Sequence, residues 1–251
     1  MSKTVAKALA ILKQFTPAAG DLGASDVARL LNMDKVIAYR LLRTLAAEDF
    51  LVQDPSNKKY RLGPGLIGLA SHNLREVPAS EVARPWMEKL RELSEETVMF
   101  AVRRGTETVV SLPLESRHPM RVTANVGDAE AMHTTASGKV MLAFGPPSLF
   151  DDVLVTGLPA LTPRTLTSPE KLRAEVKRVR ARGWAVDNEE CVAGIRAIAA
   201  GVFGRSGALE GCLAIRGPAS RMSDAVIERL APELIRATQA VSQELGHTPA
   251  A

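Results

Sequence analysis

Apolar residues recur at helical spacing in three stretches near the start of the chain, at residues 6–15, 25–31 and 34–45. A proline and a glycine lie between the first two stretches and end the first one. Ser25 has a side chain suited to cap the second stretch at its N-terminus. The pattern therefore predicts three short helices, the third beginning near Asp34.

A short hairpin is predicted directly after these helices. Residues 50–52 form an apolar run, residues 54–57 read Asp-Pro-Ser-Asn, and residues 58–62 return as a second strand with three basic side chains. Three short helices followed by a basic hairpin are typical of a winged helix-turn-helix, whose third helix lies in the major groove of DNA. A small three-helix bundle with solvated basic residues is the alternative interpretation.

Helical and strand-like patterns also fill the rest of the chain. Predicted strands cover residues 98–102, 108–112, 184–187, 196–203 and 209–216, and predicted helices cover residues 80–93, 135–144, 147–155, 169–182 and 223–245. Neighbouring strands joined by a short turn, with helices before and after them, favour an antiparallel arrangement. This part is expected to be an α+β domain around a central antiparallel sheet.

These elements divide the chain into three parts. We expect a winged helix-turn-helix over residues 1–63, a linker helix over residues 64–77 and the α+β domain over residues 78–251. The first helix and the linker carry more apolar side chains than a small domain can bury, so we expect a dimer or tetramer. These side chains are Val5, Leu9, Leu12, Leu66, Leu69 and Leu74.

The net charge of +4 comes entirely from the first 77 of the 251 residues, which hold 11 Lys and Arg against seven Asp and Glu. A basic segment joined to a neutral one is a cue for nucleic-acid binding. No apolar run is long enough to span a membrane, the N-terminus lacks a secretory signal pattern, and two cysteines are too few for a disulfide framework. We therefore expect a cytoplasmic protein with no membrane partner.

The first 70 residues resemble the DNA-binding domain of IclR-family transcriptional regulators. The similar segments are VAKALAILKQF and SDVARLLNMDKVIAYRLLRTLAAEDFLVQDPSNKKYRLGPGLIGLA, with YRLL-x-TL and D-P-x-x-x-x-Y-R-L-G-P as their most specific parts. Members usually open the recognition helix with small hydroxyl residues, where this chain has Val36 and Ile37. The expected DNA-binding residues are Lys35, Val36, Tyr39, Arg40, Arg43, Lys58, Lys59 and Arg61.

The resemblance continues to about residue 246. The segments HTTASGKVMLAF, LTPRTLTSPEKLRAEVKRVRARGWAVDNEE and GIRAIAAGVFGRSGALEGCLAIRGPASRM are similar to the family's second domain. The resemblance implies a GAF-like α+β fold that binds small organic effectors, commonly carboxylates. The expected effector-binding residues are Thr135, Ala136, Ser137, Gly138, Asp187, Ile195, Ala197, Ala214 and Arg216.

Two features of the expected effector site favour the binding of a carboxylate. The backbone N–H groups that begin the helix after Thr135 favour an anion, and the Arg216 guanidinium can hold a carboxylate with two hydrogen bonds. Relatives often carry Ser at the position of Arg216. Two simpler interpretations stay open: Thr135 and Gly138 only cap and pack a helix, and Arg216 pairs with Asp187 or Glu189.

The sequence thus predicts a ligand-responsive repressor of a catabolic operon that binds operator DNA and a small organic acid. No catalytic residue or cofactor is expected, because the chain has no phosphate-binding loop, dinucleotide fingerprint or nucleophile elbow. No metal is predicted, although His133 could meet Asp187 or Cys191 in space. The alternatives are an enzyme acting on a small carboxylate with an attached DNA-binding domain, and a nonspecific architectural DNA-binding protein.

Overall fold

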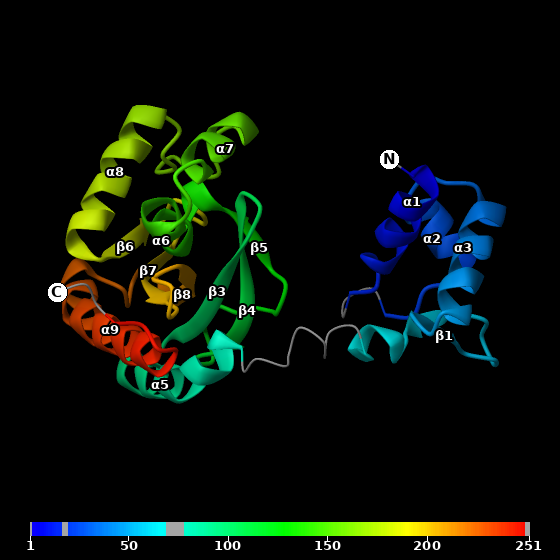
Figure 1. Cartoon of the computed structure of the whole chain (residues 1–251), viewed down its shortest axis with the longest axis horizontal. Coiled ribbons are helices and arrows are strands. Elements are labelled where there is room, and N and C mark those ends of the chain that lie inside the picture. Colours follow the sequence, from blue (N-terminus) through cyan, green and yellow to red (C-terminus); the bar gives the residue numbers. More distant parts are fainter. Residues whose placement is uncertain (1, 17–19, 69–77, 249–251) are drawn as a thin grey trace. The chain divides into compact units, whose positions relative to one another are not determined.

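The chain divides between residues 77 and 78 into two units, each with its own core. The computed structural model describes residues 2–16, 20–68 and 78–248 (Figure 1). Each unit is therefore treated separately below.

The first unit consists of three helices and a two-stranded antiparallel hairpin. Its elements are α1 (Lys3–Leu12), α2 (Ala24–Leu30), α3 (Lys35–Ala47), β1 (Leu51–Gln53) and β2 (Tyr60–Leu62). Leu22 forms a bridge to Tyr60, so the segment before α2 extends the hairpin by one short pairing. The buried core joins all of these elements and consists of Ile11, Leu22, Val27, Ala38, Leu42, Leu45, Leu51 and Tyr60. The predicted winged helix-turn-helix is confirmed.

Caps fix where the second and third helices begin. The Asp34 carboxylate accepts hydrogen bonds from the N–H groups of Val36 and Ile37, at 2.8 and 3.2 Å, and so begins α3 as predicted. The prediction that Ser25 caps α2 was wrong. Gly23 is the N-cap, and its N–H group donates to the Asp26 carboxylate at 2.9 Å.

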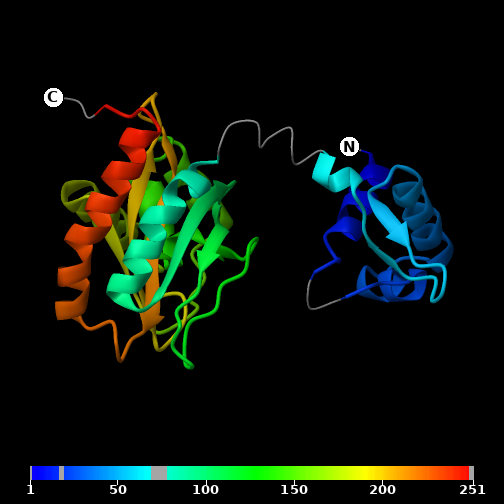
Figure 2. The same ribbon diagram turned by 90° about the horizontal axis from the view of Figure 1, so that it is seen from below.

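The second unit is built on a six-stranded antiparallel sheet with the strand order β5-β4-β3-β8-β7-β6 (Figures 1 and 2). Its strands are β3 (Thr97–Arg104), β4 (Glu107–Leu114), β5 (Ala129–Ala131), β6 (Trp184–Asn188), β7 (Ile195–Phe203) and β8 (Leu209–Pro218). Its helices are α5 (Ala79–Ser94), α6 (Ala136–Phe144), α7 (Leu149–Thr156), α8 (Pro169–Arg182) and α9 (Asp224–Glu244). The predicted α+β fold is confirmed.

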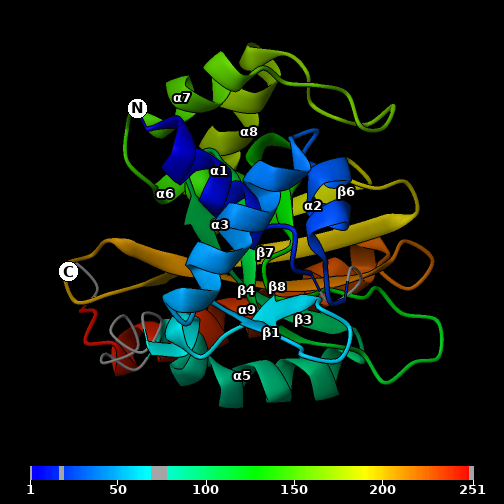
Figure 3. The ribbon, with the colours of Figure 1, turned by 90° about the vertical axis from the view of Figure 1, so that its right-hand side faces the viewer.

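Helices cover both faces of this sheet. Figure 3 shows α6, α7 and α8 on one side and α5 and α9 on the other. Successive residues of a strand point to opposite faces, and β8 follows this rule. Cys212 and Ala214 pack in the core under α6, whereas Leu213 and Ile215 pack in the core under α5 and α9.

Two short elements were not predicted, namely β5 and the 3-10 helix Met132–Thr134 that leads into α6. Of the predicted linker, residues 65–68 are helical, and residues 69–77 lie outside the described residues. Two apolar side chains expected at a dimer contact, Val5 and Leu9, are more than half exposed on α1. No helix in the described ranges is long and apolar enough to cross a membrane.

Candidate functional site

The outward face of α3 carries the side chains predicted to read DNA. Lys35, Val36, Tyr39, Arg40 and Arg43 are all exposed, while the opposite face of the helix is buried in the core. Its three basic side chains form no ion pair with any residue that the structure describes. These cations are therefore available to phosphate oxygens or base edges.

The turn of the hairpin is organised by Asp54. Its carboxylate accepts hydrogen bonds from the Ser56 amide at 2.8 Å and hydroxyl at 2.6 Å, and these bonds lower its pKa. Lys58 adopts a left-handed backbone with φ of 61°, and its N–H group donates to the Asp54 carbonyl at 2.9 Å. The turn leaves Lys58, Lys59 and Arg61 exposed, as predicted for a wing that contacts DNA.

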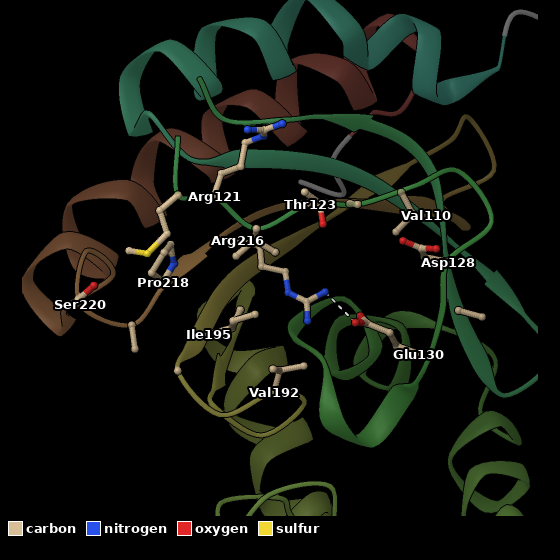
Figure 4. Close-up of a pocket in the computed structure, with 16 residues that line it drawn as sticks. Val110, Arg121, Thr123, Asp128, Glu130, Val192, Ile195, Arg216, Pro218 and Ser220 are labelled. Carbon is tan, nitrogen blue, oxygen red and sulfur yellow. Dashed lines mark hydrogen bonds and ion pairs between the residues drawn. The ribbon is translucent and has the colours of Figure 1, made fainter. Parts of the chain in front are cut away.

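A pocket of about 830 Å³ opens beside the sheet of the second unit (Figure 4). One wall comes from the connection between β4 and β5, and another from the turn between β6 and β7. Its apolar lining includes Val110, Val122, Val192 and Ile195. Apolar walls around few polar groups are typical of a small-molecule site.

Arg216 lies at the floor of this pocket and already has a carboxylate partner. Its side chain is only 9% exposed, and Nη1 donates to Glu130 Oε1 of β5 at 2.7 Å (Figure 4). Burial alone would lower the pKa of Arg216, but the charge and hydrogen bond of Glu130 outweigh burial and raise it. The alternative pairing with Asp187 or Glu189 was wrong. Nothing in the short β5 segment indicated Glu130 as the partner.

A second, much smaller cavity of about 20 Å³ lies at the N-terminus of α6. Seven of the nine predicted effector-binding residues surround it: Thr135, Ala136, Ser137, Asp187, Ala197, Ala214 and Arg216. Ile195 lines the larger pocket instead. Four residues line both cavities: Val110, Asp128, Glu130 and Arg216.

Gly138 has a packing role in the start of α6. Its N–H group donates to Thr135 Oγ1 at 2.9 Å, so this amide is not free for a ligand. A Cβ atom at Gly138 would come within 2.1 Å of the Met132 carbonyl oxygen. The expectation that the Gly138 amide faces an effector was therefore wrong, and the simpler interpretation of capping and packing applies to it.

Asp187, which lines the small cavity, belongs to a group of buried charged side chains. Asp187 accepts a hydrogen bond from the Glu190 N–H group at 2.7 Å, and its burial raises its pKa to about 6. Lys139 of α6 pairs with Glu190 Oε1 at 2.6 Å, and both side chains are buried. This ion pair was not predicted, because an apolar helix pattern gives no sign of which Lys lies beside a distant Glu.

The residues considered for a metal site have other contacts. The His133 ring lies 3.0 Å from the Pro159 carbonyl oxygen through Nε2. Burial raises the pKa of the Cys191 thiol to about 11, and its sulfur lies 3.5 Å from Glu130 Oε1. Within the described ranges, no three His, Cys, Asp or Glu side chains gather as metal ligands would.

Comparison with known proteins matches both units to domains of one family. Residues 4–55 match the IclR helix-turn-helix domain, and residues 71–243 match the C-terminal domain of bacterial IclR transcriptional regulators. The HTH-type transcriptional repressor AllR of Salmonella typhi is 32% identical over 251 residues, which cover 99% of this chain and 92% of AllR.

Two solved structures share the architecture. A candidate IclR transcriptional regulator from Silicibacter sp. TM1040 superposes with a TM-score of 0.83 at 32% identity, over 98% of both chains. An IclR homolog from Microbacterium hydrocarbonoxydans, crystallised with 4-hydroxybenzoate, gives a TM-score of 0.85 at 23% identity, over 97% of this chain and 99% of that one. The α3 face, the basic hairpin and the matches along both units agree, and the chain belongs to the IclR family of DNA-binding transcriptional regulators, which are not enzymes.

Proposed function

We propose that this chain is a cytoplasmic repressor whose affinity for operator DNA changes when a small organic acid binds the second unit. The observation that carries the proposal is the buried Arg216 guanidinium at the floor of a pocket whose walls include Val110, Val122, Val192 and Ile195. A charged donor fixes the orientation of a carboxylate, and apolar walls accept the body of the acid. The relation to the repressor AllR supports repression as the output.

In this proposal the first unit recognises the operator of a catabolic operon. The exposed side chains of α3 enter the major groove, where Arg40 and Arg43 read base edges. Lys58, Lys59 and Arg61 of the wing contact phosphates. A dimer or tetramer supports selectivity, since one recognition helix offers few base contacts and two-fold symmetry doubles them.

Binding of a ligand can regulate only if it favours one state over the other. The N-terminus of α6 and Arg216 lie around the same small cavity, and the Ala136 and Ser137 N–H groups have no hydrogen-bond partner in the described part of the chain. These amides and the guanidinium together favour an anion. The small cavity of about 20 Å³ has room for no more than a water-sized group, so the body of the acid would occupy the large pocket, which shares Arg216 with it. A small monoanionic acid is the ligand class that the two together fit.

The test uses the full chain. DNA duplexes that the chain binds are first selected from a library of random sequences. Fluorescence anisotropy measures the affinity for the enriched duplex with and without benzoate, 4-hydroxybenzoate, hexanoate and lactate. The amide of each acid is the matched neutral control. We expect at least one acid, and not its amide, to change DNA affinity by about 5-fold or more.

Two outcomes would contradict the proposal. Equal affinity for enriched and random duplexes at fixed salt would favour the architectural DNA-binding protein instead. A DNA affinity that no acid changes would reject the organic-acid effector, while leaving the DNA-binding assignment in place.

A further inference from the structure

Glu130 occupies the place where a ligand carboxylate would bind. Its Oε1 atom accepts the hydrogen bond from Arg216 Nη1 at 2.7 Å, and both side chains line the large pocket and the small cavity (Figure 4). We infer that Glu130 is an internal substitute for the effector, and that an apolar monocarboxylate binds by exchanging with it at Arg216. This inference rests on the proposed carboxylate effector. It adds why the site would prefer acids with a single negative charge.

Arg216 needs an anion at all times because it is buried and remains charged. A guanidinium that loses its ion-pair partner in a buried site is strongly unfavourable, so the pocket cannot simply stand open around it. Glu130 supplies that charge in the structure described here. Any ligand that binds the guanidinium must therefore bring a negative charge of its own, which excludes neutral amides and alcohols.

The existing pair leaves donors of the guanidinium unused. Only Nη1 has a hydrogen-bond partner among the described residues, and Nε is fully buried without one. A ligand carboxylate that takes the place of Glu130 at Nη1 can accept a second, parallel hydrogen bond from Nη2, whereas Glu130 accepts only one from the guanidinium. This difference gives a ligand carboxylate an advantage over Glu130.

The Glu130 carboxylate is positioned so that it can move away from Arg216. It belongs to the three-residue strand β5, which lies at the edge of the sheet and pairs with β4 alone. Its side chain is 27% exposed, three times the exposure of Arg216. Its backbone stays held, since Thr108 Oγ1 donates to the Glu130 carbonyl at 3.2 Å. The carboxylate can thus turn to solvent without loss of the strand.

The surroundings also limit the ligand to a single negative charge. Asp128 lines both cavities, and Asp187 lines the small one, so acidic groups lie on more than one side of Arg216. Arg121, the other cation of the large pocket, is already paired with Glu115 at 2.8 Å. A second carboxylate on the ligand would face these acidic groups and would be repelled.

The key variant is Glu130→Gln, which keeps the size of the side chain and removes its charge. If the Glu130–Arg216 pair is formed nine-tenths of the time, its removal should raise the affinity for a monocarboxylate about 10-fold. Binding of benzoate, phenylacetate and hexanoate to the full chain is measured by calorimetry. Glu107→Gln is the matched control, because it removes an exposed ion pair with Arg104 on a neighbouring strand.

We expect the gain for monocarboxylates only, with unchanged binding of benzamide and weaker binding of terephthalate than of benzoate. The inference is overturned if Glu130→Gln binds no monocarboxylate more tightly than the parent does, or if benzamide gains equally. The double variant Glu130→Gln, Arg216→Gln, which leaves no buried charge of this pair, should lose the gain. A retained gain would equally overturn the inference.

The same samples separate this inference from the proposed function. Tighter monocarboxylate binding without any change in DNA affinity would support the exchange at Arg216 and reject the proposed regulation. A DNA affinity that responds to an acid equally in the parent and in Glu130→Gln would support regulation and reject the exchange.

Discussion

The two units treat charged side chains in opposite ways. In the first unit the basic residues of α3 and of the wing are exposed, and none of them pairs with a described residue through an ion pair. In the second unit Lys139, Glu190 and Arg216 are buried, and each has a partner of opposite charge. The first arrangement leaves charge free to meet DNA, whereas the second keeps charge paired inside the unit, where we propose that the effector binds.

In the first unit, a charged side chain can therefore be replaced without loss of stability. In the second unit, replacement of a buried charge should lower stability. An exposed cation contributes little to folding, so its replacement should change DNA binding alone. An ion pair whose two partners are both buried, as Lys139 and Glu190 are, must remain matched, so a change in either partner should lower the stability of the second unit. Tryptophan fluorescence can follow the second unit selectively in the full chain, because both tryptophans, Trp86 and Trp184, lie there.

The largest effect is expected from Lys139→Met. Removal of the ammonium leaves Glu190 buried without its counter-charge, and the free energy of unfolding of the second unit should fall by about 3–5 kcal/mol. Urea unfolding followed by tryptophan fluorescence measures this change. The double variant Lys139→Met, Glu190→Gln should recover part of the loss, and Lys177→Met, an exposed lysine of α8, should lie within about 0.5 kcal/mol of the parent. If Lys139→Met lowers the free energy of unfolding no more than Lys177→Met does, the contrast between the two units is wrong.

Replacement of Arg40 and Arg43 by Ala should show the opposite behaviour. Each arginine that reads a base contributes about 1–3 kcal/mol to discrimination, so affinity for the enriched duplex should fall well over 10-fold. The urea midpoint of the first unit, followed by circular dichroism, should stay nearly unchanged because both side chains are exposed. Arg29→Ala on α2 is the control, since that arginine pairs with Asp26. If the double variant binds the enriched duplex as tightly as the parent does, α3 is not part of the DNA interface.

The smallest effect concerns the pH dependence of the second unit. Burial raises the pKa of Asp187 to about 6 from its usual 3.8, so the folded unit takes up this proton before the unfolded chain does. The stability that this proton provides is lost as the pH rises through about 6. Between pH 7.5 and pH 5 the parent should therefore gain about 1 kcal/mol relative to Asp187→Asn. Unfolding curves that shift in parallel for both proteins over this range would contradict the assignment.

The same contrast explains what could be predicted from the sequence. The exposed basic face of α3 follows from local helical spacing, and the Asp-Pro-Ser-Asn turn follows from local turn chemistry. The resemblance to the family singled out Arg216 and most residues around the small cavity. It did not reveal Glu130, which lies 86 residues away in the chain and meets Arg216 only when the sheet assembles.

Three other features were not predicted, each for a different reason. Gly23 was passed over as a cap because Ser25 offers a side-chain oxygen, yet the Asp26 carboxylate satisfies the start of α2 from inside the helix. The strand β5 has only three residues, too few for an alternating pattern to stand out. The Lys139–Glu190 pair depends on two segments 51 residues apart. Of these three, only the Lys139–Glu190 pair is a contact between distant segments, whereas the cap and the short strand are local features.

The long connection between β4 and β5 bears on which ligand the pocket can accept. Residues 115–128 form one wall of the large pocket, and they are attached through their backbone: Thr97 Oγ1 donates to the Val122 carbonyl at 2.5 Å, and Arg221 donates to the Met120 carbonyl at 3.1 Å. These attachments do not depend on which side chains the wall carries. Met120 and Thr123 are exposed at the pocket and can change without disturbing the core. In the proposed function, substitutions in this wall would therefore change which acid binds, while the sheet beneath keeps its sequence.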